Sequence, residues 1–93
     1  MGVFTPCQAV IVQSQPLGMR TPAGEDMYAF LLTILTEGRA PYPIRIGGPV
    51  PAAARPLLDP GNTVPAKRRT DGDDHEVVID WEGALTQLAH SAA

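Results

Sequence analysis

The apolar positions of the chain fall into short runs separated by turn residues, and most of these runs have the composition of β-strands. Residues 8–14 contain three successive β-branched or aliphatic side chains that favour a strand. A proline- and glycine-containing stretch, residues 15–26, is predicted to be a loop or a wide hairpin connection. Residues 27–36 are the most apolar run; a helix capped by Asp26 and stopped by Gly38 is the alternative, but the β-type composition and the lack of a polar stripe favour a strand.

A third strand is predicted over residues 42–46. Ile44 and Ile46 share one face there, and Arg45 lies on the other, which is the alternation of a half-buried strand. Prolines at its start confine it to the edge of a sheet. It is expected to form an antiparallel hairpin with residues 27–36.

Two β-type runs, residues 63–67 and 76–81, flank a polar turn at residues 68–75. The segment before them, residues 47–62, is dense in glycine and proline and predicts frequent chain reversal, with at most one or two helical turns in residues 51–58, where Pro51 takes the first position. Gly61 is placed for a type II turn.

The end of the chain predicts a short helix over residues 81–90. Trp81, Leu85 and Leu88 recur at the spacing of one helix face, and Asp80 precedes them as a candidate N-cap.

These elements predict a single all-β domain over residues 1–93, with a small barrel in residues 7–81 and the C-terminal helix after it. Ninety-three residues are too few for two cores, and a hydrophobic fraction of 44% is ordinary for a folded protein. Ten prolines and nine glycines agree with short elements joined by many turns.

Charge and cysteine content exclude several classes. The net charge of −3 gives no broad attraction to nucleic acid or to an anionic membrane. Cys7 is the single cysteine, so no internal disulfide forms. The amino end lacks the basic and apolar regions of a signal peptide, and the longest apolar run is about half of what a membrane span needs. We expect a cytoplasmic protein without membrane insertion.

The order of these pieces resembles a small domain that recurs in uncharacterised actinobacterial proteins. The resemblance covers residues 7–82. It rests on Ala9-Val10-Ile11, residues 27–36, Pro41-Tyr42, Val50-Pro51, Asp59-Pro60-Gly61, Val64-Pro65 and Val78-Ile79-Asp80-Trp81. It implies a five-stranded small β-barrel similar to the OB-fold. No activity, cofactor or catalytic residue comes with it.

Two features suggest chemistry, and for both a structural role is favoured. The polar turn carries a cluster that offers oxygen ligands to a divalent cation. Its members are Asp71, Asp73, Asp74, His75 and Glu76. Their spacing does not match a calcium loop, and a solvated hairpin turn is favoured. Cys7 has no basic neighbour to stabilise a thiolate, so a small buried hydrophobe is favoured over a nucleophile.

No catalytic residue, metal ligand set or cofactor is therefore predicted, and an enzyme is not expected. A small hydrolase or metal-dependent enzyme built on Cys7 and the acidic turn is the weakest alternative.

A stronger alternative is an oligonucleotide- or oligosaccharide-binding module of the OB type, using Arg45, Lys67, Arg68 and Arg69. Such modules also need aromatic platforms in a basic groove. Aromatic residues are few here, and acids follow the basic triad directly and cancel its field, so nucleic acid is an improbable partner.

The favoured function is that of a non-enzymatic accessory or adaptor protein acting through protein–protein contact. The stripe of Trp81, Leu85 and Leu88 must either cover the protein's own barrel or dock on another protein or a second copy. With Tyr42, these residues are the predicted interface.

Overall fold

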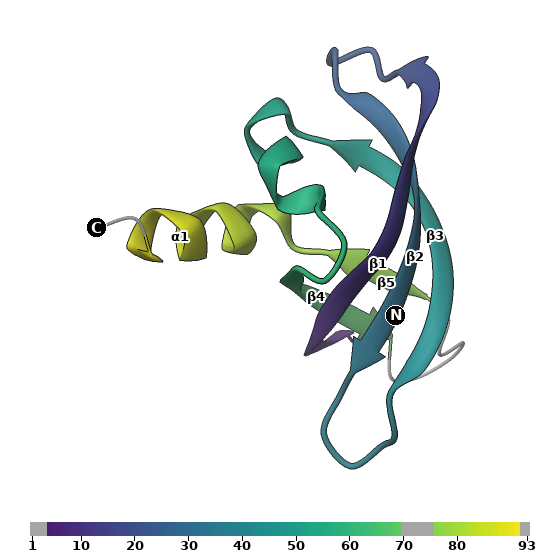
Figure 1. Ribbon diagram of the computed structural model, residues 1–93, viewed down its shortest axis with the longest axis vertical. Coiled ribbons are helices and arrows are strands. Elements are labelled where there is room, and N and C mark those ends of the chain that lie inside the picture. Colours follow the sequence, from purple (N-terminus) through teal and green to yellow (C-terminus); the bar gives the residue numbers. More distant parts are fainter. Residues whose placement is uncertain (1–3, 70–75, 92–93) are drawn as a thin grey trace.

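A computed structural model describes residues 4–69 and 76–91, which form one antiparallel sheet of five strands with two helical segments (Figure 1). The strand order is β3-β2-β1-β4-β5. The elements are β1 (Phe4–Arg20), β2 (Asp26–Leu35), β3 (Tyr42–Val50), the 3₁₀ helix η1 (Ala52–Leu58), β4 (Thr63–Arg69), β5 (Val77–Ile79) and the α-helix α1 (Trp81–Ser91). The mostly-β class and the C-terminal helix are confirmed. The sheet is not closed between its end strands, so the predicted barrel is not confirmed.

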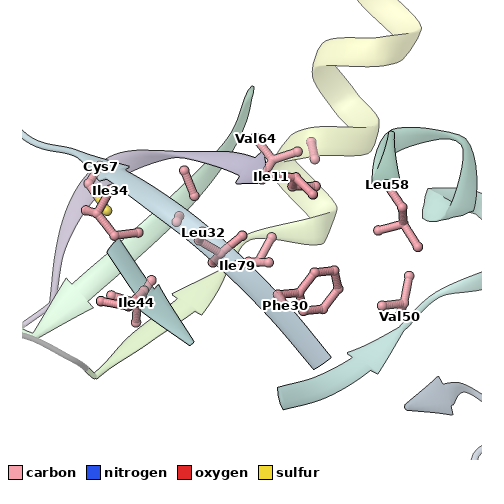
Figure 2. Packing of buried hydrophobic residues seen from close by; sticks show 14 of the residues in the cluster. Cys7, Ile11, Phe30, Leu32, Ile34, Ile44, Val50, Leu58, Val64 and Ile79 are labelled. Atoms are coloured by element: carbon pink, nitrogen blue, oxygen red, sulfur yellow. The ribbon is translucent and has the colours of Figure 1, made fainter. Parts of the chain in front are cut away.

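The core lies on one face of the curved sheet, where every strand contributes alternate residues (Figure 2). In β1 these are Cys7, Ala9 and Ile11, and the other strands follow the same period of two. β2 lies between β1 and β3, and its Leu32 and Ile34 have no exposed surface. The extended conformation predicted for residues 27–36 is therefore confirmed. The strand is apolar on all sides because it lies inside the sheet, with a neighbouring strand on each side.

The helix and the turn before β4 follow their local signals. The Gly83 N–H donates to Asp80 Oδ1 at 3.0 Å, so Asp80 caps α1 as predicted. The Asn62 N–H donates to the Asp59 carbonyl at 3.2 Å, and Gly61 has φ of +93°, which is the geometry of the expected type II turn.

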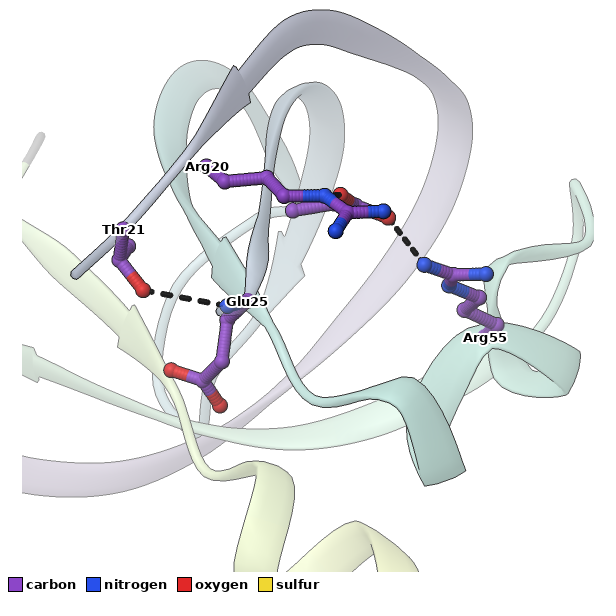
Figure 3. Close-up of polar contacts among 5 residues, drawn as sticks. Arg20, Thr21, Glu25 and Arg55 are labelled. Atoms are coloured by element: carbon purple, nitrogen blue, oxygen red, sulfur yellow. Dashed lines mark hydrogen bonds and ion pairs between the residues drawn. The ribbon is translucent and has the colours of Figure 1, made fainter. Parts of the chain in front are cut away.

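Residues 15–26, predicted as a loop or a wide hairpin connection, do lie in a hairpin, but the loop is wrong for residues 15–20 and the connection is only residues 21–25. β1 continues to Arg20 and pairs with β2 beyond a bulge between Ile11 and Gln13. Proline and glycine favour a turn here locally, but hydrogen bonding to β2 keeps these residues extended. At the tip, Thr21 Oγ1 accepts a hydrogen bond from the Glu25 N–H at 3.2 Å (Figure 3).

An ion-pair bridge fixes this hairpin to η1. Asp26 accepts from Arg20 Nε at 3.0 Å on one side and pairs with Arg55 of η1 on the other (Figure 3). The hairpin and η1 are therefore joined at the end of the sheet where β3 finishes.

A second correction concerns residues 47–49, which the sequence places in a turn-rich segment. They continue β3 as far as Val50 and pair with β2, with Tyr28 opposite Gly48 and Met27 opposite Pro49. Neither Gly47 nor Gly48 has a positive φ, so both are ordinary extended residues. The ladder again overrides local turn composition.

Both helical segments lie on the core side of the sheet (Figure 1). Ala54 and Leu58 of η1 and Ala84 of α1 are buried in the core. No helix in the described part of the chain has the length and apolarity to cross a membrane.

Candidate protein-binding groove

The hydrogen-bond phase of the sheet decides which main-chain groups are left without a strand partner. The Arg69 N–H donates to the Glu76 carbonyl at 2.9 Å, and the Asp80 N–H donates to the Pro65 carbonyl at 3.0 Å. On the other side of β4, the Ile11 N–H donates to the Asn62 carbonyl at 2.8 Å. Because an antiparallel ladder bonds alternate residues, these contacts fix the phase of β1, β4 and β5.

The same phase carries through β2 to β3. Residues 7, 9 and 11 of β1 bond toward β4, so residues 8 and 10 bond toward β2. In β2 the even-numbered residues then bond toward β3, and their partners are the even-numbered residues 42–50. The main chain of the odd-numbered residues of β3 is consequently directed away from the sheet.

We call these outward main-chain groups, those of Pro43, Arg45, Gly47 and Pro49, the free edge of β3. The two prolines lack an N–H, and an edge strand's open side is where proline is tolerated. The edge therefore presents two donors, the N–H groups of Arg45 and Gly47, between two prolines. By the same argument, Val77 and Ile79 direct their main chain away from β4.

These two open edges border one apolar groove of about 220 Å³. We call it the seam groove. Residues 46–49 of β3 and residues 77–79 of β5 form its walls, with Phe30 and Trp81 between them. The walls belong to the two end strands of the sheet, so the seam groove occupies the place where the sheet stays open.

Two aromatic residues, Phe30 and Trp81, line this groove, and Tyr28 stacks beside Phe30. The ring centroids of Phe30 and Trp81 are 6.0 Å apart, and those of Phe30 and Tyr28 are 6.1 Å apart. Phe30 is buried, whereas Trp81 is half-buried. Gly48 faces inward opposite Tyr28, and the position of its absent Cβ has no atom within 4 Å. The groove therefore combines an aromatic floor with a gap beside β3.

The outer face of β3 has a different character. Ala29 lies opposite Gly47 in the ladder, and these small residues leave a hollow of about 340 Å³. Gln13 and Gln15 of β1 line one side of it, and Arg45 of β3 lines the other. Within residues 4–69 and 76–91, Arg45 has no ion pair, and its guanidinium is exposed beside this hollow.

Two acids near the groove, Glu76 and Asp26, are paired with arginines. Glu76 accepts from Arg69 Nη1 at 2.7 Å. Asp26, near the end of β3, is held between Arg20 and Arg55.

The four residues predicted as a protein interface do not form one surface. Trp81 lines the seam groove, while Leu85 packs on the protein's own core. Leu88 is 42% exposed and lies at a separate hollow beside Leu57. Tyr42 is at the opposite end of β3, with the Arg39 guanidinium 4.1 Å above its ring. The structure thus brings only Trp81 of the four to the groove.

The predicted basic set is also divided. Lys67 is exposed, whereas Arg68 is half-buried and its Nε donates to Thr36 Oγ1 at 3.0 Å. Arg69 is paired with Glu76. These three lie on β4, which two strands, β2 and β1, separate from Arg45 on β3. None of the three lines the seam groove or the outer hollow.

Cys7 is buried in the core. Burial raises the pKa of its thiol, and the Arg68 charge opposes that rise only in part. A raised pKa keeps the thiol protonated and weakly nucleophilic near neutral pH. Of the acidic turn, Asp71, Asp73, Asp74 and His75 fall outside the described residues, and the described part contains no group of three or more metal-ligating side chains.

Residues 47–49 are the part of the site that the sequence analysis missed. Gly47, Gly48 and Pro49 resemble a turn when they are considered alone. The sequence signal for the edge is that Pro43 and Pro49 are an even number of residues apart. Both prolines therefore direct their main chain to the same side of β3 as Arg45, the side that needs no N–H donor.

Comparisons of the chain with protein-family models, with curated proteins and with solved structures gave no match. Its function must therefore follow from the geometry of its own residues.

Proposed function

We propose that this protein is a non-enzymatic adaptor that binds an extended segment of a partner protein. The segment adds to the sheet as a strand along the free edge of β3, and its inward side chains enter the seam groove. Main-chain hydrogen bonds supply affinity in such strand addition, and pockets for alternate side chains supply specificity.

The observation that carries this proposal is the coincidence of an open strand edge with an apolar groove. The N–H groups of Arg45 and Gly47 point outward from β3, and the groove lined by Phe30 and Trp81 opens beside them. An added strand satisfies both features at once, because its main chain meets the edge while alternate side chains face the groove.

The topology supports an OB-like sheet that the partner completes. The strands follow the order β3-β2-β1-β4-β5, with η1 connecting β3 to β4 and the opening between β3 and β5. A strand added at that opening extends the sheet toward a closed barrel, which removes exposed edges.

The alternative of an oligonucleotide or oligosaccharide binder has one supporting observation, the outer hollow with Gln13, Gln15 and Arg45. Phe30 borders this hollow, but its ring is buried and packs beside Trp81, so it offers no exposed platform on which a base could stack. A mixed-sequence single strand is therefore included below as a control ligand, and we expect it not to bind.

The test compares Gly47→Pro with Gly47→Ala. Proline at residue 47 removes one of the two outward N–H donors. Residue 47, like Pro43 and Pro49, directs its main chain away from β2, so the pairing of β3 with β2 is kept. Alanine keeps the donor, and its Cβ would lie 3.7 Å from the Tyr28 carbonyl oxygen, an ordinary contact. Seven-residue segments are selected from a random displayed library on the wild-type protein, and their affinities are measured by fluorescence anisotropy.

We expect the selected segments to bind Gly47→Pro at least tenfold more weakly, since one hydrogen bond and its geometry are lost. Their affinity for Gly47→Ala should stay within about threefold of the wild-type value. A library that yields no binders, or binders that ignore Gly47→Pro, contradicts the proposal. Tight, salt-sensitive binding of the control oligonucleotide supports the alternative instead.

A further inference from the structure

We infer that the segment recognised at the free edge of β3 alternates apolar residues with at least one acidic residue, and that the acid pairs with Arg45. This inference rests on the proposed function and names the chemistry of its partner. It follows from three features of β3: the two prolines, the two faces of the strand and the Arg45 guanidinium, which has no ion pair with any described residue.

The prolines set the length of the contact. Pro43 and Pro49 offer no donor to an added strand, so the donors lie at Arg45 and Gly47. An added strand is therefore held over the five residues 44–48. A segment of about seven residues is long enough to cover this window and both flanking carbonyl groups.

The inner face of β3 sets the apolar positions of the segment. In an antiparallel pair, residues directly opposite each other have side chains on the same face of the sheet. Partner residues opposite Ile46 and Gly48 consequently point into the seam groove, toward Phe30 and Trp81. The gap left by Gly48 gives the second of these side chains room for an aliphatic branch.

The outer face sets the charge. A partner residue opposite Arg45 or Gly47 lies on the outer face, and the one opposite Arg45 stands beside an exposed guanidinium. The ladder places Leu31 next to Arg45, and Pro43 and Gly47 are its same-face neighbours along β3. None of these is acidic, so no neighbour among them competes with a partner carboxylate for the guanidinium. A partner lysine there meets a like charge.

The charge also gives the contact a preferred register. A one-residue slip would turn the acid into the apolar groove and the apolar side chains out to solvent. Alternation and charge therefore favour the same alignment of the segment against residues 44–48.

Three synthetic peptides test this inference. Each carries valine at positions 1, 3, 5 and 7 and threonine at positions 2 and 6, and the central position is glutamate, lysine or threonine. Uncharged Gly-Ser flanks and a fluorescent label are common to all three. Binding is measured to the wild-type protein, to Arg45→Gln, to Arg45→Glu and to Gly47→Pro.

We expect the glutamate peptide to bind the wild-type protein about tenfold more tightly than the lysine peptide at low ionic strength, with the threonine peptide between them. Arg45→Gln should remove this difference, and Arg45→Glu should reverse it. High salt should shrink the difference without abolishing binding of the threonine peptide.

The outcomes separate the inference from the proposed function. If all three peptides bind equally to the wild-type protein and all are weakened by Gly47→Pro, strand addition stands and the acidic specificity is wrong. If a charge preference is present but Arg45→Glu leaves it unchanged, the inference is also wrong. If no peptide binds in a manner that depends on residue 47, both are overturned. Thermal melting of each variant confirms that the fold is retained.

Discussion

Replacing Leu32 with alanine is expected to lower the free energy of unfolding by about 2–5 kcal/mol. Leu32 has no exposed surface and lies at the centre of the sheet, opposite Ile11 on one side and Ile44 on the other. Three strands surround the site, so the backbone cannot collapse into the cavity that the truncation leaves. The total free energy of unfolding of a domain of this size is roughly 5–14 kcal/mol, so the expected loss is a large part of its stability. Urea unfolding followed by circular dichroism measures it.

Leu31→Ala is the matched control, since it removes the same atoms from the next residue on the other face. Leu31 is half-buried beside Arg45 and the outer hollow. Its truncation should cost no more than about 1 kcal/mol. Equal losses at residues 31 and 32 would mean that β2 does not alternate as described.

Gly48→Pro is expected to destabilise the fold by on the order of 2–3 kcal/mol, whereas Gly47→Pro should change stability by less than about 1 kcal/mol. Gly48 is in the phase that bonds β3 to β2, so proline removes a ladder hydrogen bond and directs its ring at the neighbouring strand. Gly47 is in the outward phase, where proline removes no bond within the sheet.

The two variants have the same composition and differ by one residue in position, so any effect of proline on the unfolded chain is nearly equal in both. Their melting temperatures under identical conditions give the comparison. A Gly47→Pro loss as large as that of Gly48→Pro would show that β3 is bonded on both sides.

Much of the fold could be predicted because its signals are local and reinforce one another. Residues 27–36 have strand composition and apolar residues throughout, and the Asp80 cap and Gly61 turn are specified by single residue types. Two of the errors, at residues 15–20 and 47–49, have a common cause. Glycine and proline there favour turns locally, but pairing with β2 extends both neighbouring strands.

The candidate site was harder to predict because it depends on relations between strands. Trp81 is recognisable as an aromatic residue on a helix face, but sequence spacing does not reveal that it stands beside β3 and β5. The outward direction of the Arg45 and Gly47 amides depends on which residues are hydrogen-bonded in each of the successive strand pairs from β4 to β3. Openness of the sheet is likewise a tertiary property, and no single segment encodes it.

Amide hydrogen exchange, followed residue by residue by NMR, tests the free edge of β3 most directly. In the protein alone, we expect the amides of Arg45 and Gly47 to exchange on the order of 100-fold faster than those of Ile44, Ile46 and Gly48, which bond to β2. Addition of a binding peptide should slow the Arg45 and Gly47 amides selectively. If these two amides are already as slow as that of Ile46 in the free protein, the edge is occupied and no strand can be added there.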